Sequence, residues 1–404
     1  MYRRSLYLDK ILPFVDKPLI KVISGIRRSG KSSILILIKQ ILIERGVNEK
    51  QIIFLNFESF DNQLLTKDEI LYAFIKSKIQ SKEKYYLFLD EIQEVYNWEK
   101  VLNSCLLDFN IDIYITGSNS KLLSSELSTY IAGRYIEFQI QTLNFKESLS
   151  FNKNDGNELI SKQEKFKYFL EMGGFPIIHL GNYSQENAYK LVQDIYSSVV
   201  LRDAIQRYAI RDLELFERVI RYVFDGIGTS FSAKNIADYF KSQQRKIDLN
   251  TVYNYLNALE GAFIIYKIPR FDIQGKEILK TQEKYYVSDL SLVYSKEGYK
   301  EQKINAYLEN IVLLELKSRD YKVFVGKYKE YEIDFIATKN NQKIYIQVCY
   351  RMIEQSTIDR EFFSLKKVAD NYPKYVLSMD ESWKDTIEGI KHLNIIDFLL
   401  LESF

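Results

Sequence analysis

The sequence has very few cysteines and histidines, and this excludes several classes of protein. It contains two of each among 404 residues. Cys105 and Cys349 lie far apart and form no CxxC spacing, so neither a disulfide framework nor a thiolate metal site is expected. Two histidines are too few to suggest a histidine-based zinc centre.

Long apolar runs and an excess of charge are also missing. No stretch reaches the roughly 18 apolar residues that a membrane-spanning helix needs, and Met1–Arg4 is not followed by the apolar core of a secretion signal. We therefore predict a cytoplasmic protein that does not contact a membrane. The 56 Lys and Arg nearly balance the 54 Asp and Glu, so any surface that binds nucleic acid must be a local patch.

The most informative stretch that is present is Gly25–Ser32, GIRRSGKS, with two glycines separated by four residues and followed by Lys and Ser. An apolar strand pattern precedes it at 20–23, and a helical pattern follows at 33–44. Such a loop turns backbone N–H groups toward a phosphate at a helix N-terminus. Lys31 would reach the outer phosphates and Ser32 would bind Mg²⁺, so ATP and Mg²⁺ are the predicted cofactors. The alternative is a surface turn that holds a lysine by coincidence.

Downstream, strand and helix patterns alternate, which favours a parallel sheet covered on both faces. Further strands are predicted at 51–57, 85–89, 112–116 and 135–140. The third strand ends in Asp90 and Glu91, at the edge where such sheets bind ligands. Asp90 would hold Mg²⁺ and Glu91 would polarise the attacking water, although a solvated acidic turn is the alternative.

These motifs resemble the AAA+ ATPases, and specifically the prokaryotic AAA-type family that carries a C-terminal domain of unknown function. The resemblance covers essentially the whole chain through GIRRSGKSS, FLDEIQ, TGSNSKLL, AGRYIEF, GGFP, LEN, EIDF and IQV. It implies that Asn119 is the sensor-1 residue, with Asn56 as a partner of Glu91. It also implies that Arg134 is the arginine finger that reaches a neighbouring subunit. From the residues alone, Asn119 could equally cap a helix over 120–128, and Arg134 could pair with an acid such as Glu137.

The segment GGFP at 173–176 resembles the lid motif that packs on the nucleotide base in signal-transducing P-loop ATPases. A helix C-cap followed by proline at the next helix start explains the same residues. The lid helices are predicted at 163–172 and 185–208, after a polar loop at 152–157. The predicted nucleotide-binding set is Gly25, Arg28, Ser29, Gly30, Lys31, Ser32, Ser33, Gly174 and Pro176.

Three helix patterns and two strand patterns then predict a winged helix-turn-helix. The helices are expected at 213–224, 233–240 and 249–260, and the strands at 263–268 and 284–287. The third helix has no Lys or Arg, so the pattern favours phosphate contact over sequence reading. The basic residues lie at its rim and in the wing: Lys241, Arg245, Lys246, Lys267, Arg270, Lys276 and Lys280. A packing module is the alternative.

The last part of the chain shows an αβββαβ order similar to the PD-(D/E)XK nuclease fold. Glu309 and Asp334 match two metal-binding positions of that fold. Gln347 replaces the expected Glu, and Cys349 replaces the expected Lys. Because Gln is a weak ligand for a hard cation and Cys supplies no ammonium, we expect lost or much weakened cleavage.

The predicted fold is thus α/β, with an AAA+ core at 1–143, a helical lid at 144–211, a winged helix at 212–295 and the nuclease-like domain at 296–404. The predicted function is a Mg²⁺-dependent ATPase, a homo-oligomer such as a hexameric ring, that remodels duplex or branched DNA. The alternatives are a nucleotide-dependent switch in signalling or defence, similar to the signal-transducing P-loop ATPases (STAND), and an ATP-regulated nuclease.

Overall fold

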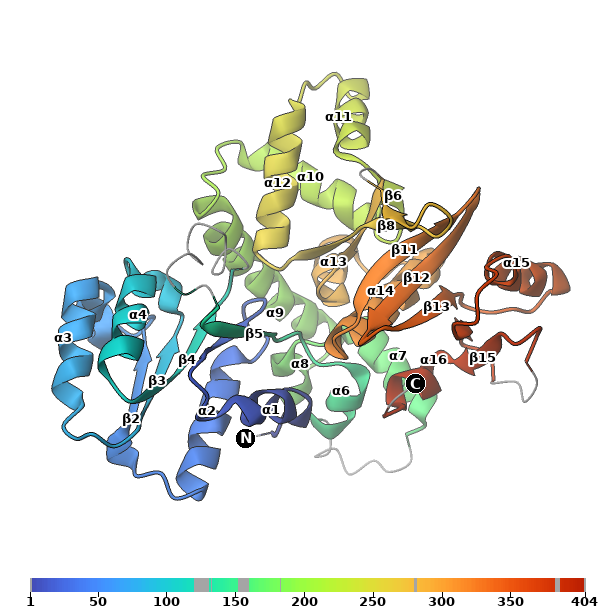
Figure 1. Cartoon of the computed structure of the whole chain (residues 1–404). Helices are drawn as coiled ribbons and strands as arrows, with labels where there is room; N and C mark the ends of the chain where they lie inside the picture. Colours follow the sequence, from blue (N-terminus) through green and yellow to red (C-terminus); the bar gives the residue numbers. More distant parts are fainter. Residues whose placement is uncertain are drawn as a thin grey trace. The chain divides into compact units, whose positions relative to one another are not determined.

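Figure 1 shows the computed structural model of the protein, which describes residues 2–119, 131, 133–151, 160–181, 183–279, 282–381 and 386–402. The helix predicted at 120–128, the loop at 152–157 and Lys280 lie outside these residues. The chain forms two compact units, Met1–Thr142 with Gly261–Phe263, and Leu143–Glu260 with Ile264–Phe404. Within the described part of the chain, no helix has the length and apolar composition needed to cross a membrane.

The first unit is built on a five-stranded parallel sheet with the order β2-β3-β4-β1-β5. Its strands are β1 (Ile20–Ser24), β2 (Ile52–Asn56), β3 (Tyr85–Asp90), β4 (Ile111–Gly117) and β5 (Tyr135–Gln139). Its helices are α1 (Ser5–Ile11), α2 (Lys31–Glu44), α3 (Asp68–Lys78) and α4 (Trp98–Asp108), with short 3₁₀ turns at Leu12–Phe14, Glu49–Gln51, Phe60–Thr66 and Ile92–Glu94. All five predicted strands are confirmed.

Apolar side chains cover both faces of this sheet, as expected for a parallel sheet. Residues of α1 and α2 pack on one face, and residues of α3 and α4 pack on the other (Figure 1). The strands β1, β3 and β4 are buried along their whole length. Register pairs the last residue of β1, Ser24, with Gly117 of β4, and Asn56 of β2 with Asp90 of β3. The segments that follow these strands therefore leave the sheet at one edge.

The second unit begins with helices and continues into a winged helix. The helices are α6 (Phe145–Phe151), α7 (Lys162–Met172), α8 (Pro176–Leu180), α9 (Gln185–Ser198), a π-helical segment (Val199–Gln206), α10 (Leu213–Asp225), α11 (Ala233–Ser242) and α12 (Leu249–Gly261). A three-stranded sheet of order β6-β10-β7 follows, with β6 (Ser230–Phe231), β7 (Ile265–Ile268) and β10 (Glu283–Val287). The predicted hairpin is present, and β6 is an additional strand.

The rest of this unit is a mixed seven-stranded sheet with the order β15-β14-β13-β12-β11-β8-β9. Its strands are β8 (Arg270–Asp272), β9 (Glu277–Ile278), β11 (Lys322–Tyr328), β12 (Tyr331–Lys339), β13 (Gln342–Val348), β14 (Lys374–Ser378) and β15 (Lys391–Asn394). The helices are α13 (Leu290–Glu297), a 3₁₀ turn at Glu301–Lys303, α14 (Ile304–Ser318), α15 (Gln355–Lys366) and α16 (Ile395–Leu400). The predicted αβββαβ order is confirmed, and β15 and α16 extend it.

The wing departs from the prediction. Between β7 and β10 the chain forms β8 and β9, and β8 pairs in parallel with β11 of the C-terminal sheet. This pairing satisfies an edge that would otherwise be open, and Phe271 packs against the apolar cluster of that sheet. Two predicted phosphate-binding residues of this region form polar contacts within the protein. Lys267 pairs with Glu283 at 3.0 Å, and Arg270 donates to Gln282 at 2.8 Å and lies 3.9 Å from Glu332.

Candidate active site

The loop between β1 and α2 needs glycine at both of its fixed positions. Gly25 has φ +140°, and a Cβ placed on it would meet the Ile140 carbonyl oxygen at 2.1 Å. Gly30 has φ +99° and forms the N-cap of α2, which begins at Lys31. Arg28 adopts φ +67°, and its side chain is exposed. The helix N-terminus, with its positive dipole end, thus opens directly onto the loop, which favours an anion there.

Lys31 connects this loop to the end of β3. Its side chain is buried, and its ammonium donates to the Ile26 carbonyl at 3.2 Å. The same Nζ atom lies 3.8 Å from Glu91 Oε1. A buried lysine at the start of a helix, next to a carboxylate, supplies the cation that a triphosphate requires.

Asp90 lies at the centre of a network of hydroxyl and amide donors. Its Oδ1 accepts from Ser32 Oγ at 3.1 Å and from Thr116 Oγ1 at 2.5 Å, and its Oδ2 accepts from Asn56 Nδ2 at 3.0 Å. Burial raises the pKa of Asp90, and the hydrogen bonds from Thr116 and Ser32 oppose this rise. Ser32 and Asp90 are therefore oxygen donors within hydrogen-bonding distance of each other, a set that fits Mg²⁺. The resemblance paired Asn56 with Glu91, whereas its amide donates to Asp90.

Glu91 sits on a sharp turn at the end of β3. It has φ +56°, its backbone N–H donates to Thr116 Oγ1 at 2.8 Å, and its Oε2 accepts from Gln93 Nε2 at 2.5 Å. A left-handed conformation at a non-glycine residue is uncommon and persists only where neighbouring groups enforce it. The carboxylate next to the phosphate lysine is therefore held in place by its own backbone and by Gln93.

Two positioning residues were missed by the sequence analysis. Thr116 bonds both Asp90 and Glu91, as described above. Arg4 is buried, and its guanidinium donates to the Ser29 carbonyl in the loop at 2.8 Å and to the Gln141 carbonyl after β5 at 3.0 Å. The only signal for Thr116 was a polar residue within the apolar strand pattern at 112–116, and for Arg4 there was none.

Replacing Thr116 by valine, which keeps the volume but removes the hydroxyl, is expected to weaken this site. Asp90 loses a donor and the Glu91 N–H loses its acceptor, so the free energy of unfolding should fall by about 2–4 kcal/mol. The Mg²⁺ concentration needed for half-maximal turnover should rise, because the pKa of Asp90 would rise further. Chemical denaturation and a Mg²⁺ titration of turnover measure both effects. Thr116→Ser, which keeps the hydroxyl, should behave like the wild type, and equal losses in both variants would contradict this role.

The remaining predicted residues of the first unit lie at two different edges of the sheet. Asn119 is buried and follows β4 by two residues, at the edge that carries the loop. Arg134 precedes β5, and its carbonyl accepts from the N–H of Ile20 at the start of β1, which is the opposite edge. Its exposed side chain donates to Asn103 Oδ1 at 2.5 Å, and no ion pair with an acid is present among the residues that the structure describes. A five-residue strand spans roughly 16 Å, so Arg134 is too far to serve its own loop.

Gly174 and Pro176 lie in the second unit, where they shape a helix junction. Gly173 ends α7 with φ +74°, and a Cβ there would meet Asp289 Oδ1 at 2.1 Å. The N–H of Gly174 donates to Asp289 Oδ2 at 2.8 Å, and Pro176 begins α8. These contacts fit the helix-cap interpretation of GGFP. The contact with a nucleotide base stays a prediction.

The three predicted nuclease-like residues do come together. Glu309 on α14 and Asp334 on β12 both lie next to Lys284 Nζ, at 3.3 and 3.6 Å. Gln347 Oε1 on β13 accepts from the backbone N–H of Asp334 at 3.3 Å. Cys349 is buried in the apolar cluster of the C-terminal sheet, where burial raises the pKa of its thiol. Among the residues that the structure describes, no group of three His, Cys, Asp or Glu side chains is arranged to hold a metal ion.

The parallel sheet, the loop after β1 and the paired carboxylates after β3 define a P-loop protein of the AAA class. In agreement, the family model described as "AAA domain" matches residues 17–149, and a second, "Domain of unknown function (DUF8612)", matches residues 163–303. An uncharacterised protein of Haemophilus influenzae is 36% identical over 406 residues, covering 99% of both chains. Protein MJ1544 of Methanocaldococcus jannaschii, also uncharacterised, is 34% identical over 396 residues, covering 93% of this chain and 86% of the relative. The chain belongs to the family of these AAA-domain proteins.

Solved structures show a distant likeness. The Orc1 protein of Aeropyrum pernix, in complex with DNA, is 11% identical with a TM-score of 0.31, covering 73% of this chain and 92% of that chain. The AMPPCP-bound DnaA of Aquifex aeolicus is 15% identical with a TM-score of 0.31, covering 63% and 85%.

Proposed function

We propose that this protein binds ATP at the N-terminus of α2 and hydrolyses it. The observation that carries the proposal is that the loop residues Lys31 and Ser32 contact the two carboxylates at the end of β3, about 60 residues away. Lys31 lies at ion-pair distance from Glu91, and Ser32 donates a hydrogen bond to Asp90. Main-chain amides of 25–32 and the ammonium of Lys31 would hold the phosphates. Ser32 and Asp90 would hold Mg²⁺, which neutralises charge on the phosphate oxygens when bound.

Glu91 is the residue we assign to activate water. Its carboxylate lies close enough to Lys31 to share a phosphate pocket, and the turn at the end of β3 holds its backbone. Asn119, buried at the same edge, would orient the water against the terminal phosphate. The test is Mg²⁺-dependent release of phosphate from ATP by the purified protein. If the purified protein shows neither turnover nor affinity for adenine nucleotides, the proposal is wrong.

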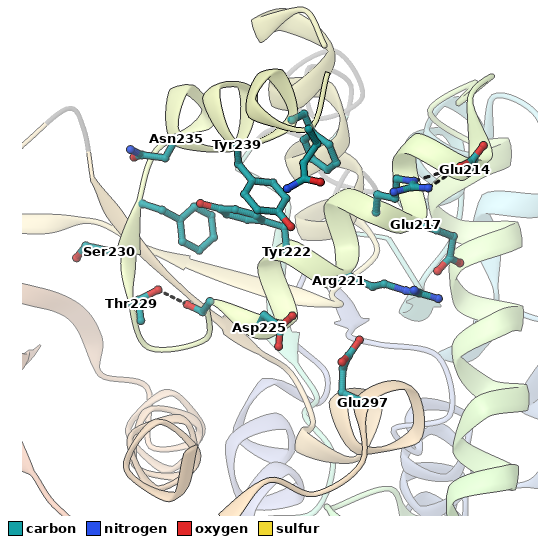
Figure 2. A pocket seen from close by; sticks show the side chains of 15 residues that line it. Glu214, Glu217, Arg221, Tyr222, Asp225, Thr229, Ser230, Asn235, Tyr239 and Glu297 are labelled. Atoms are coloured by element: carbon teal, nitrogen blue, oxygen red, sulfur yellow. Dashed lines mark hydrogen bonds and ion pairs between the residues drawn. The ribbon is translucent and has the colours of Figure 1, made fainter. Parts of the chain in front are cut away.

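We further propose that the winged helix contacts DNA through phosphates. On α12 the side chains of Val252, Leu256 and Leu259 are buried, and Asn254 and Asn257 are exposed. Tyr253 is also exposed, so the outer face offers amides and an aromatic ring. The cations flank this face, because Lys241, Arg245 and Lys246 are all exposed just before α12. Arg245 shares Glu214, in the first turn of α10 (Figure 2), with Arg218, which leaves the two lysines as the stronger phosphate contacts.

Replacing Lys241 and Lys246 together by alanine is expected to weaken DNA binding by on the order of tenfold at low salt. Each phosphate contact also contributes about 0.9 to the slope of log affinity against log salt, so the slope should decrease by up to about 1.8. Fluorescence anisotropy with single-stranded, duplex and four-way DNA at several salt concentrations measures both. Lys162→Ala with Lys165→Ala removes two exposed lysines of α7 and serves as the matched control. An equal loss in both double variants would contradict a local contact.

A nucleotide-dependent switch is the second candidate, and the wing favours it. With β8 and β9 built into the C-terminal sheet and with Lys267 and Arg270 in polar contacts, the winged helix offers fewer free cations than expected. A switch would bind ADP tightly, turn over slowly and change its oligomeric state on nucleotide exchange. Turnover with and without DNA, combined with light scattering in ADP and ATP, separates the two functions.

A further inference from the structure

A lysine from the winged helix lies inside the nuclease-like centre. Lys284 belongs to β10, yet its ammonium lies 2.9 Å from Glu332 Oε1, 3.3 Å from Glu309 Oε2 and 3.6 Å from Asp334 Oδ1. Only 4% of this residue is exposed. The carboxylates come from α14 and β12, so one ammonium joins three segments that are distant in sequence.

Other polar groups also contact these carboxylates. Tyr286 OH, two residues along β10, donates to Glu309 Oε2 at 2.8 Å. The backbone N–H of Val348 donates to Asp334 Oδ2 at 2.8 Å. Glu332 has Arg270 at 3.9 Å and Ser230 Oγ at 3.5 Å. Each carboxylate therefore has the ammonium and at least one further polar group.

The three carboxylates and the ammonium also affect one another's pKa values. Burial, and secondarily the charge of Glu309, raise the pKa of Asp334 to about 8. Burial also raises the pKa of Glu309, although Lys284 opposes that rise. The three carboxylates keep the pKa of Lys284 above its usual value despite its burial, so the ammonium stays charged.

We propose that Lys284 closes a latent divalent-cation site formed by Glu309, Glu332 and Asp334. Carboxylates are the ligands that hard divalent cations prefer, and the Lys284 ammonium lies within 3.6 Å of all three, of which Glu309 and Asp334 are the least exposed. The same contact fixes β10 of the winged helix to the C-terminal sheet, next to the β8–β11 pairing. The C-terminal domain is then a metal-independent module that does not cleave DNA, and it is joined rigidly to the winged helix.

The test compares Mn²⁺ binding to nucleotide-free wild type and to Lys284→Gln, in the full chain. The wild type should show no change in melting temperature with millimolar Mn²⁺ and no cleavage of plasmid DNA. Lys284→Gln should melt roughly 10 °C lower, because breaking a buried ion pair is costly, and Mn²⁺ should recover much of that shift. The control Lys284→Gln with Asp334→Asn and Glu309→Gln should not respond to Mn²⁺.

Two results would overturn the proposal. One is stoichiometric Mn²⁺ binding by the wild type that disappears in Glu309→Gln with Asp334→Asn, since Lys284 would then stand beside a metal instead of replacing it. The other is a folded Lys284→Gln protein that does not respond to Mn²⁺. If Lys284→Gln fails to fold, the Mn²⁺ titration and the plasmid assay of the wild type still test whether the wild type binds a metal ion at this centre.

Discussion

Replacing Lys31 by alanine is expected to reduce ATP turnover by at least about 100-fold while the chain keeps its fold. The ammonium that lies between the Ile26 carbonyl and Glu91 is the cation placed to stabilise charge that develops on the transferred phosphate. Loss of one such preorganised group costs about 10²–10³ in rate. Because Lys31 stands at the first position of α2, where the helix needs no side-chain cap from it, the helix itself should persist. Phosphate release and circular dichroism melting measure the two outcomes.

The matched control is Lys39→Ala, which removes the same charge two turns further along α2. It should keep wild-type turnover, because it lies outside the loop that binds phosphate. Wild-type turnover in Lys31→Ala would contradict the ATP site itself. Equal losses in both variants would mean that the helix, rather than the position of the ammonium, had been damaged.

The first unit could be predicted well because its signals are local. The loop from Gly25 to Ser32 is one continuous stretch, and its strand and helix follow from apolar periodicity. Asp90 and Glu91 follow a buried strand directly. Contacts between segments that are distant in sequence could not be predicted. Arg4 is 25 residues from the Ser29 carbonyl and 137 from that of Gln141, and nothing in the pattern around it indicates a partner.

The second unit shows the same limit at the level of domains. The pattern of a winged helix was readable, because Val252, Leu256 and Leu259 are spaced for one face of a helix. The pairing of β8 with β11 could not be predicted from the sequence. Edge strands pair through backbone N–H and C=O groups, which are the same in nearly every sequence. Lys284 was hidden for a related reason. It lies in one predicted domain and its carboxylates in the next, and periodicity contains no information about such contacts.

Arg134→Ala is expected to lower turnover by about 10³-fold or more while nucleotide binding is retained, provided that the protein forms an oligomer. An arginine finger supplied from a neighbour contributes rate factors of about 10³–10⁵. Arg134 is exposed at the edge of the sheet away from its own loop, so it could serve only the site of another copy. Steady-state turnover, together with the affinity for a fluorescent ATP analogue, separates catalysis from binding. Asn103→Ala removes the partner of the guanidinium and should leave turnover nearly unchanged.

Mixing Arg134→Ala with Lys31→Ala protein tests the arrangement between copies directly. Each variant alone has no complete site, because one lacks the finger and the other lacks the phosphate lysine. In a mixed oligomer, a subunit with an intact Lys31 can lie next to a subunit with an intact Arg134, and that pair forms a working site. Turnover should therefore rise on mixing and depend on the ratio of the two proteins. Normal turnover in Arg134→Ala alone would show that Arg134 is not an arginine finger. No recovery of turnover on mixing would show that Arg134 does not act on a neighbouring subunit.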